Sequence, residues 1–134
     1  MCIRDRPPSV QSVQGPQSIG ISFDAYQWLR VRDFDVIHFP ELLGHAYYSV
    51  LAKHQGLAFS NTVLCVGAHS PISWIREINR ELPLTIDEPE IDFMERESVA
   101  LADVVVSPSQ YLLGWMRTSG WRLPRCLLYT SRCV

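Results

Sequence analysis

The sequence has no long apolar run and no excess of positive charge. No stretch approaches the roughly 18 consecutive apolar residues that a membrane-spanning helix needs, and the segment from Met1 to Pro8 lacks the apolar core of a secretory signal. Its 12 basic and 14 acidic residues give a net charge of −2, whereas nucleic-acid-binding domains are usually basic. Because 47% of the residues are hydrophobic and only 19% are charged, we expect one soluble globular domain.

Cysteine is also scarce away from the two ends of the chain. Three of the four cysteines lie in the end segments: Cys2, Cys126 and Cys133. The codons ATG TGT ATA AGA GAC AGR encode Met1 to Arg6, and this DNA resembles the transposon end used to prepare sequencing libraries. Its reverse complement, read as TGT CTC TTA TAC ACA TCT, encodes Cys126 to Ser131, and the forward repeat then encodes Arg132 to Val134 and a stop. We therefore expect both ends to be translated adapter, which has to be excluded from fold reasoning.

This interpretation divides the chain into an adapter scar over residues 1–6, a natural segment over 7–125 and a second scar over 126–134. Only Cys65 then remains, inside an apolar run, where a cysteine usually acts as a small core hydrophobe. A single thiol fits a reducing, cytoplasmic location. It also excludes a cysteine-ligated metal site, and we expect no metal at all.

Strand and helix signals alternate along the natural segment. Short β-branched runs bounded by proline or polar residues predict strands over 35–39, 61–68 and 104–106. Apolar residues at helical spacing predict helices from about Ile21 to Arg30 or Arg32, and over 44–58, 72–81, 91–102 and 110–119. In the second of these helices the predicted apolar stripe consists of Ala46, Val50, Leu51 and Leu57. Residues 7–20 and 82–89 are predicted to be loops.

This alternation predicts an α/β fold with a partial, doubly wound parallel sheet of the Rossmann-like type and helices on both faces. The strands are almost continuously apolar, which is typical of strands that are covered on both sides. Ser109 is expected to cap the last helix and Gly120 to end it.

Polar residues follow each predicted strand, and in a parallel sheet ligands bind beyond the carboxyl ends of the strands. The candidates are Glu41, His69, Ser70, Ser107 and Ser109. Each strand is followed by a helix whose N-terminal amides favour an anion. The set suits a hydroxylated, partly anionic ligand such as a sugar phosphate.

Each candidate also has a purely structural interpretation, which stays open at this point. His69 can cap a turn, Ser107 can satisfy turn amides and Ser109 can act only as an N-cap. Glu41 can complement the dipole of the following helix. His38 is expected to be a core histidine with its polar atoms satisfied. Packing roles are expected for three tryptophans: Trp74, Trp115 and Trp121.

Three segments resemble the N-terminal domain of family-4 glycosyltransferases of the GT-B fold. They are FDVIHFPE over 34–41, VGAHSPISW over 66–74 and FMERESVALADVVVSPSQYLLGW over 93–115. No one of them is diagnostic, whereas their order and spacing together are fairly specific. The resemblance covers most of residues 23–124, but the glycine-rich loop that normally lies upstream and the whole C-terminal domain have no counterpart in the chain.

The resemblance implies a fragment of a retaining glycosyltransferase of the hexosyltransferase type, which needs no metal ion or other cofactor. Its partners would be a nucleotide-sugar donor and a hydroxyl-bearing acceptor, either a glycan or a lipid-linked one, with a peripheral membrane contact left open. The absent donor-binding domain would hold most of the nucleotide, so this fragment alone would be inactive. His69 matches the family's functional histidine, which faces the transferred sugar. Ser107 and Ser109 match more weakly, and Glu41 is placed only by geometry.

Two other classes of protein stay open. A different enzyme or a binding module with a flavodoxin-like sheet would show the same alternation of strands and helices, although a complete one should begin with a strand near its N-terminus. A non-catalytic homologue kept as an interaction scaffold would retain the same core motifs and lose the donor-binding residues, which lie outside this chain.

Overall fold

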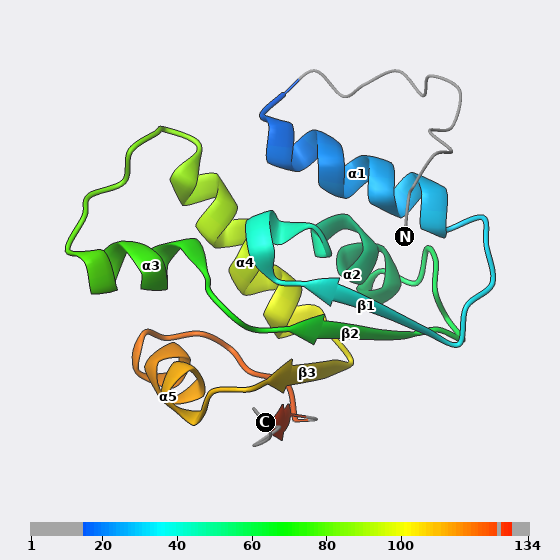
Figure 1. The fold of residues 1–134 in the computed structure, drawn as a ribbon. Helices are drawn as coiled ribbons and strands as arrows, with labels where there is room; N and C mark the ends of the chain where they lie inside the picture. Colours follow the sequence, from blue (N-terminus) through cyan, green and yellow to red (C-terminus); the bar gives the residue numbers. More distant parts are fainter. Residues whose placement is uncertain (1–14, 126, 130–134) are drawn as a thin grey trace.

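The fold was analysed in a computed structural model, which describes residues 15–125 and 127–129. Within these residues, five α-helices and one short 3-10 helix accompany a parallel sheet (Figure 1). The helices are α1 (Gln17–Leu29), η1 (Leu42–Gly44), α2 (Tyr47–His54), α3 (Ile72–Asn79), α4 (Glu88–Leu101) and α5 (Gln110–Thr118). The strands are β1 (Val36–Pro40), β2 (Val63–Gly67), β3 (Val104–Ser107) and β4 (Leu127–Tyr129). The predicted α/β class is confirmed.

All strand pairs are parallel, and the strand order is β1-β2-β3-β4. Pro40 aligns with Gly67, and Gly67 aligns with Val106, so the carboxyl ends of β1, β2 and β3 meet at one edge. The three strands predicted from the sequence are all present. Within the described residues the order does not reverse, as it would at the switch point of a doubly wound sheet.

The fourth strand, β4, lies inside the segment that the codon interpretation assigns to an adapter. Val105 aligns with Leu127, and Ser107 aligns with Tyr129. The codon interpretation excluded this segment from the fold, and in the structure it nevertheless pairs with β3. A free strand edge pairs through backbone groups, and Leu-Leu-Tyr has a high strand propensity, so the pairing needs no natural partner sequence. The other residues of both predicted scars lie outside the described part of the chain.

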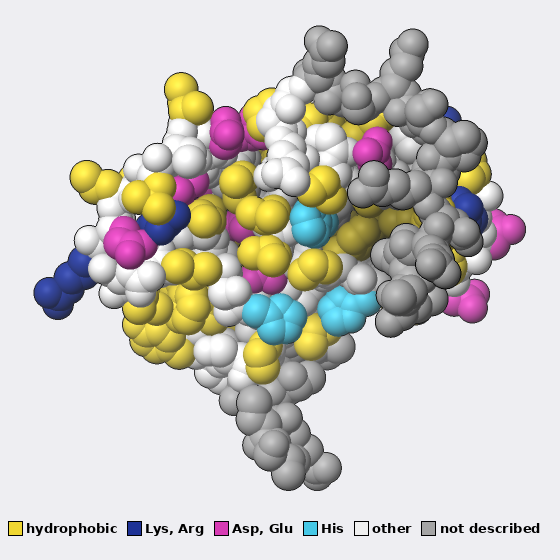
Figure 2. All heavy atoms as spheres, turned by 45° about the horizontal axis from the view of Figure 1, so that its top comes forward, with side chains coloured by type: hydrophobic (Ala, Val, Ile, Leu, Met, Phe, Trp, Pro, Cys, Tyr) yellow, Lys and Arg dark blue, Asp and Glu magenta, His cyan; other side chains and the backbone are white. Residues whose placement is uncertain are grey.

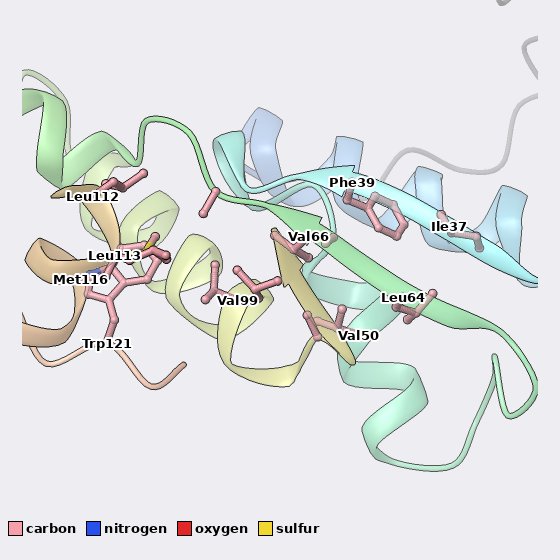
Figure 3. Packing of buried hydrophobic residues seen from close by; sticks show 14 of the residues in the cluster. Ile37, Phe39, Val50, Leu64, Val66, Val99, Leu112, Leu113, Met116 and Trp121 are labelled. Carbon is pink, nitrogen blue, oxygen red and sulfur yellow. The ribbon is translucent and has the colours of Figure 1, made fainter. Parts of the chain in front are cut away.

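The core lies on one face of the sheet (Figure 3). Ile37 and Phe39 from β1, Leu64 and Val66 from β2, and Val105 from β3 point into it. The helices contribute Val50, Val99, Leu112, Leu113 and Met116, all 0 or 1% exposed. Successive neighbouring strands joined by right-handed crossovers place their helices on the same face, which explains this one-sided core.

The opposite face of β1 is open, which corrects the expectation that every strand is covered on both sides. Burial alternates along β1, and Val36 is 57% exposed. His38 is exposed as well, so it is not the core histidine that the sequence suggested. On β2, Val63 is 40% exposed, whereas the rest of that strand is buried. An apolar run of five residues does not distinguish a strand covered on one face from a strand covered on both.

Helix α1 begins at Gln17, inside the stretch that was predicted to be a loop. Pro16 precedes its first turn, and the buried hydroxyl of Ser22 fastens the helix to the segment before α2. This hydroxyl donates to the carbonyl of His45 at 3.1 Å and accepts from the backbone amide of Tyr48 at 3.2 Å. The first turn of α1 is polar and contains a glycine, so the sequence pattern did not predict a helix there. Tertiary contacts, and not helix propensity, stabilise this turn.

Most other predicted boundaries agree with the structure to within a few residues. The side chain of Ser109 accepts the amide of Leu112 as the N-cap of α5, and Gly120 follows that helix with a φ of +78°. The predicted packing roles of Trp74, Trp115 and Trp121 are confirmed. Leu57, predicted in the apolar stripe of a helix over 44–58, is 70% exposed, because α2 already ends at His54. Among the described residues, no helix is long and apolar enough to cross a membrane.

At the amino edge of the sheet, opposite the candidate site, an ion pair ties β2 to the helices. The carboxylate of Asp103 accepts the backbone amide of Leu64 at 2.7 Å and the ammonium of Lys53 at 2.6 Å. Lys53 also donates to the carbonyl of Thr62 at 2.6 Å. Asp103 belongs to the segment 93–115 that resembles the glycosyltransferase family. Its contacts with Leu64 and Lys53 hold the fold together.

Candidate functional site

The structure places the predicted site residues along the carboxyl edge of one sheet. Glu41 follows β1, His69 and Ser70 follow β2, and Ser107 ends β3 with Ser109 two residues later. The backbone amide of Glu41 donates to the carbonyl of Gly67 at 3.0 Å, which fixes the first two strand exits against each other.

His69 is the most accessible of these side chains, at 57% exposure. Its Nδ1 atom lies 3.0 Å from the carbonyl oxygen of Gly67 and 3.5 Å from Oε2 of Glu41. The ring therefore makes the local backbone contact that a turn-capping histidine would make. It nevertheless remains open to solvent on its other side, so it can still contact a ligand.

Glu41 is almost completely buried, with its side chain 1% exposed. Its Oε1 atom accepts the backbone amides of His69, at 2.7 Å, and of Ser70. Its Oε2 atom is buried and has no hydrogen-bond partner among the described residues. Glu41 was predicted to contact substrate, but the geometry gives it contacts with the loop that carries His69. Ser70 is half-buried and takes part through its backbone amide.

The two serines at the end of β3 use their hydroxyls within the turn. The Ser107 hydroxyl accepts the backbone amide of Ser109 at 3.2 Å, and its side chain is fully buried. The Ser109 hydroxyl accepts the amide of Leu112 at 3.1 Å. These contacts are the ones expected if Ser107 satisfies a turn amide and Ser109 caps a helix. Of the two serines, Ser109 is half-buried and keeps a partial opening toward solvent.

Glu95, on α4, also lies at this edge, and the sequence pattern did not identify it as a site residue. It is fully buried and accepts the backbone amides of Leu43, at 3.0 Å, and Ile72, at 2.8 Å. Burial raises the pKa of Glu95 to about 8, and the nearby charge of Glu41 acts in the same direction. A glutamate in a helix is usually solvated. The only sequence signal for burial of Glu95 is its place between Met94 and Ser98, which are themselves buried.

Gly67 is the second feature that the sequence did not identify. A Cβ atom on Gly67 would lie 2.8 Å from Cε1 of His69 and 2.9 Å from Nε2 of His38. The two imidazoles therefore flank one glycine on the open face of the sheet. In Figure 2, histidine side chains gather among hydrophobic ones on the face turned toward the viewer.

The helix that follows β2 is not available to an anion in the way the sequence suggested. The amide of Ile72, the first residue of α3, is occupied by Glu95, and the amides of His69 and Ser70 just before it are occupied by Glu41. The amide of Leu112 in α5 is occupied by Ser109. Because these amides are already occupied, the edge offers an anion few backbone donors and suits a neutral hydroxylated ligand better.

A shallow hollow of about 430 Å³ lies between α3 and α4, beyond Ile72. Its main charged group, the guanidinium of Arg76, is already engaged by Glu81 at 2.6 Å and by Glu88 at 3.0 and 2.8 Å. The hollow therefore offers little unpaired charge to a ligand. Among the described residues, no group of three His, Cys, Asp or Glu side chains could hold a metal ion.

The chain matches no protein-family model, no curated protein and no solved structure.

Proposed function

We propose that this chain is part of a retaining glycosyltransferase and forms the acceptor side of its cleft. The observation that carries the proposal is His69, an exposed imidazole at the carboxyl edge of a parallel sheet, with its ring fixed from behind. A few precisely placed polar groups fix the orientation of a ligand in such a site, and His69 supplies one at this edge. The order of the three sequence segments supports the same assignment.

The charges at this edge indicate which domain of the proposed enzyme would stabilise the leaving diphosphate. A retaining transfer passes through an oxocarbenium-like state while negative charge leaves on the diphosphate. Glu41 and Glu95 occupy the amides at the start of α3, so this domain is poorly suited to stabilise that leaving charge. A separate donor-binding domain with basic residues would have to do so, and such electrostatic stabilisation usually contributes more to catalysis than any other single effect.

The rest of the proposed protein follows from the same assignment. The outer edge of β1 pairs with no strand among the described residues, and its outer face is partly exposed. Further strands beyond β1 would complete a doubly wound, Rossmann-like sheet with its switch point at β1. The acceptor would be a glycan or a lipid-linked sugar, the location would be cytoplasmic, and neither a cofactor nor a metal ion would be needed.

A non-catalytic scaffold is the second candidate, and a specific observation favours it. The polar atoms of Glu41, Ser107 and Ser109 mostly bond the chain's own backbone, which a scaffold would also need. His69 and His38 are the exposed polar side chains that then remain on this part of the edge, beside the half-buried Ser70 and Ser109.

The test uses the longer reading frame recovered from the source DNA, expressed beside the 134-residue chain. We expect sugar transfer from the longer protein and none from the chain alone. In the longer protein, His69→Ala should lower kcat/KM by about a hundred- to a thousandfold if its hydrogen bond forms in the transition state. Its free energy of unfolding should change much less.

Asp24→Asn is a suitable control, because Asp24 is an exposed carboxylate on α1. It should leave both quantities unchanged. Turnover by the 134-residue chain, or normal activity per folded molecule in the His69→Ala variant, would contradict the proposal. A longer frame that transfers no sugar at all would favour the scaffold.

A further inference from the structure

We propose that Glu41 is a positioning residue that keeps the proton of neutral His69 on Nδ1, so that the Nε2 lone pair faces the cleft as a hydrogen-bond acceptor. The role that this gives His69 rests on the proposed function. The tautomer itself follows from the geometry of the described residues.

The two groups beside Nδ1 of His69 are both acceptors. One is the carbonyl oxygen of Gly67 at 3.0 Å, and the other is Oε2 of Glu41 at 3.5 Å. Neither a carbonyl nor a carboxylate can donate a hydrogen bond to an unprotonated nitrogen. The neutral ring is therefore stabilised with Nδ1 as the donor, and an imidazole has only one other nitrogen.

Glu41 is suited to this task because its two carboxylate oxygens have different partners. Oε1 accepts the backbone amides of His69 and Ser70, so the carboxylate and the ring are attached to the same short loop. Oε2 is buried, has no hydrogen-bond partner among the described residues and lies on the Nδ1 side of the ring. A buried acceptor without a donor is costly, and a proton on Nδ1 of His69, 3.5 Å away, would reduce that cost.

The absence of a side chain at Gly67 makes room for the ring, because a Cβ there would lie 2.8 Å from Cε1 of His69 and 2.9 Å from Nε2 of His38. Glu95 supports the carboxylate from behind by holding the amides of Leu43 and Ile72, on either side of the strand exits. The Nε2 atom of His69 has no hydrogen bond among the described residues, and the ring is 57% exposed.

The consequence for ligand recognition is directional. A neutral His69 with its lone pair on Nε2 accepts a hydrogen bond from a hydroxyl group and cannot donate one to a phosphate oxygen from that atom. The site would therefore select a sugar or acceptor hydroxyl in preference to the diphosphate. This matches the state of the nearby backbone amides, because Glu41 and Glu95 already occupy those of His69, Ser70 and Ile72, which an anion would otherwise use.

The experiment measures the imidazole nitrogens of the full 134-residue chain by long-range ¹H–¹⁵N NMR, at a pH at which the histidines are neutral. The His69→Ala variant identifies the signals of His69 among the four histidines. An unconstrained neutral imidazole favours the proton on Nε2, so a protonated Nδ1 at His69 is the distinguishing result. Finding the proton of His69 mainly on Nε2 in the unmodified chain would overturn the proposal.

Glu41→Gln provides the second arm. The glutamine oxygen can keep both amide contacts of Oε1, while its NH₂ group takes the place of Oε2 beside Nδ1. A donor would then face a donor, and we expect the Nδ1–H signal to be lost or strongly reduced. An unchanged tautomer in Glu41→Gln would assign the proton to the carbonyl of Gly67 alone and overturn the role of Glu41.

Glu95→Gln is the matched control, because it changes a neighbouring buried carboxylate that does not contact His69. Its tautomer signal should equal that of the unmodified chain. An equal change in both variants would mean that Glu41 acts only by holding the fold together. The readout needs no sugar transfer, so a failure of the proposed function and a failure of this inference give different results.

Discussion

The two edges of the sheet are held together by carboxylates in opposite ways. At the amino edge, the carboxylate of Asp103 binds one backbone amide and the ammonium of Lys53, and both side chains remain partly exposed. At the carboxyl edge, Glu41 and Glu95 are 1% and 0% exposed and bind four backbone amides between them. No lysine or arginine pairs with either glutamate among the described residues.

The carboxyl groups at the two edges differ in the electrostatic cost of their surroundings. A partly exposed pair of opposite charges needs little desolvation and contributes little stability. Two buried carboxylates near each other are unfavourable unless one is protonated or both are well hydrogen-bonded. The two buried glutamates lie at the edge that carries His69, where their hydrogen bonds to backbone amides fix the loops after β1 and β2.

The largest effect that we expect comes from breaking the packing of η1 at the carboxyl edge. Gly44 has a φ of +65°, and a Cβ there would overlap the Cβ of Met94 and lie 3.0 Å from its backbone carbon. Gly44→Ala combines a left-handed alanine, about 1–2 kcal/mol, with overpacking of about 1–3 kcal/mol. We expect urea unfolding to show a loss of about 3 kcal/mol or more.

Gly56→Ala is the control for that measurement, because Gly56 also has a positive φ, +73°, and nothing lies within 4 Å of its Cβ position. It should lose only the backbone part, about 1–2 kcal/mol. Equal losses in the two variants would show that the contact with Met94 contributes nothing and that the carboxyl edge is less tightly packed than the structure indicates.

Much of the fold could be predicted from local patterns. The β-branched runs at 35–39 and 104–106 and the cap at Ser109 lie within one or two residues of the observed elements, because backbone preference and capping act locally. Helix α1 was placed too late because its first turn is polar and depends on the contacts of Ser22. The open face of β1 was missed because burial of a short apolar strand is decided by its neighbours and not by its own residues.

The candidate site was predictable in position and not in chemistry. The rule that parallel strands end at one edge placed Glu41, His69 and Ser107 together, as observed. The rule says nothing about which polar atoms are consumed by nearby amides. Glu95 comes from a helix 54 residues after Glu41 in the chain, and its role exists only because α4 packs under η1. Long-range packing of this kind has no signature in a single sequence.

The pH dependence of stability should distinguish the two edges, with an effect of intermediate size. Glu95 has a pKa of about 8 in the folded chain against an ordinary value of 4.5. Between these values it is protonated when folded and ionised when unfolded, so the unfolded chain binds fewer protons and the free energy of unfolding falls as the pH rises. At about 1.4 kcal/mol per unit, we expect a loss of about 2 kcal/mol between pH 6 and pH 8.

Glu95→Gln should remove this slope, because glutamine resembles the protonated glutamate and does not titrate. At pH 6 Glu95 is already ionised in the unfolded chain, so the variant should match the unmodified chain only near pH 4, exceed its stability by about 2 kcal/mol at pH 6 and exceed it further at pH 9. Asp24→Asn makes the same chemical change at an exposed position and should retain the slope. A chain whose stability is constant from pH 6 to pH 9, or a Glu95→Gln variant that keeps the slope, would show that Glu95 is ionised at neutral pH.

The smallest effect should come from the amino edge, through Lys53→Met. Methionine keeps most of the aliphatic stem of Lys53 and removes the ammonium that binds Asp103 and the carbonyl of Thr62. The side chains of Lys53 and Asp103 are 23% and 35% exposed, so water can replace the lost contacts. We expect urea unfolding in low salt to show a loss of about 1 kcal/mol or less. That loss should shrink further in about 1 M salt, where charges are screened within roughly 3 Å. A loss above about 2 kcal/mol that does not respond to salt would mean that the ion pair at the amino edge is as firmly integrated as the carboxylates at the carboxyl edge. The contrast between the two edges would then fail.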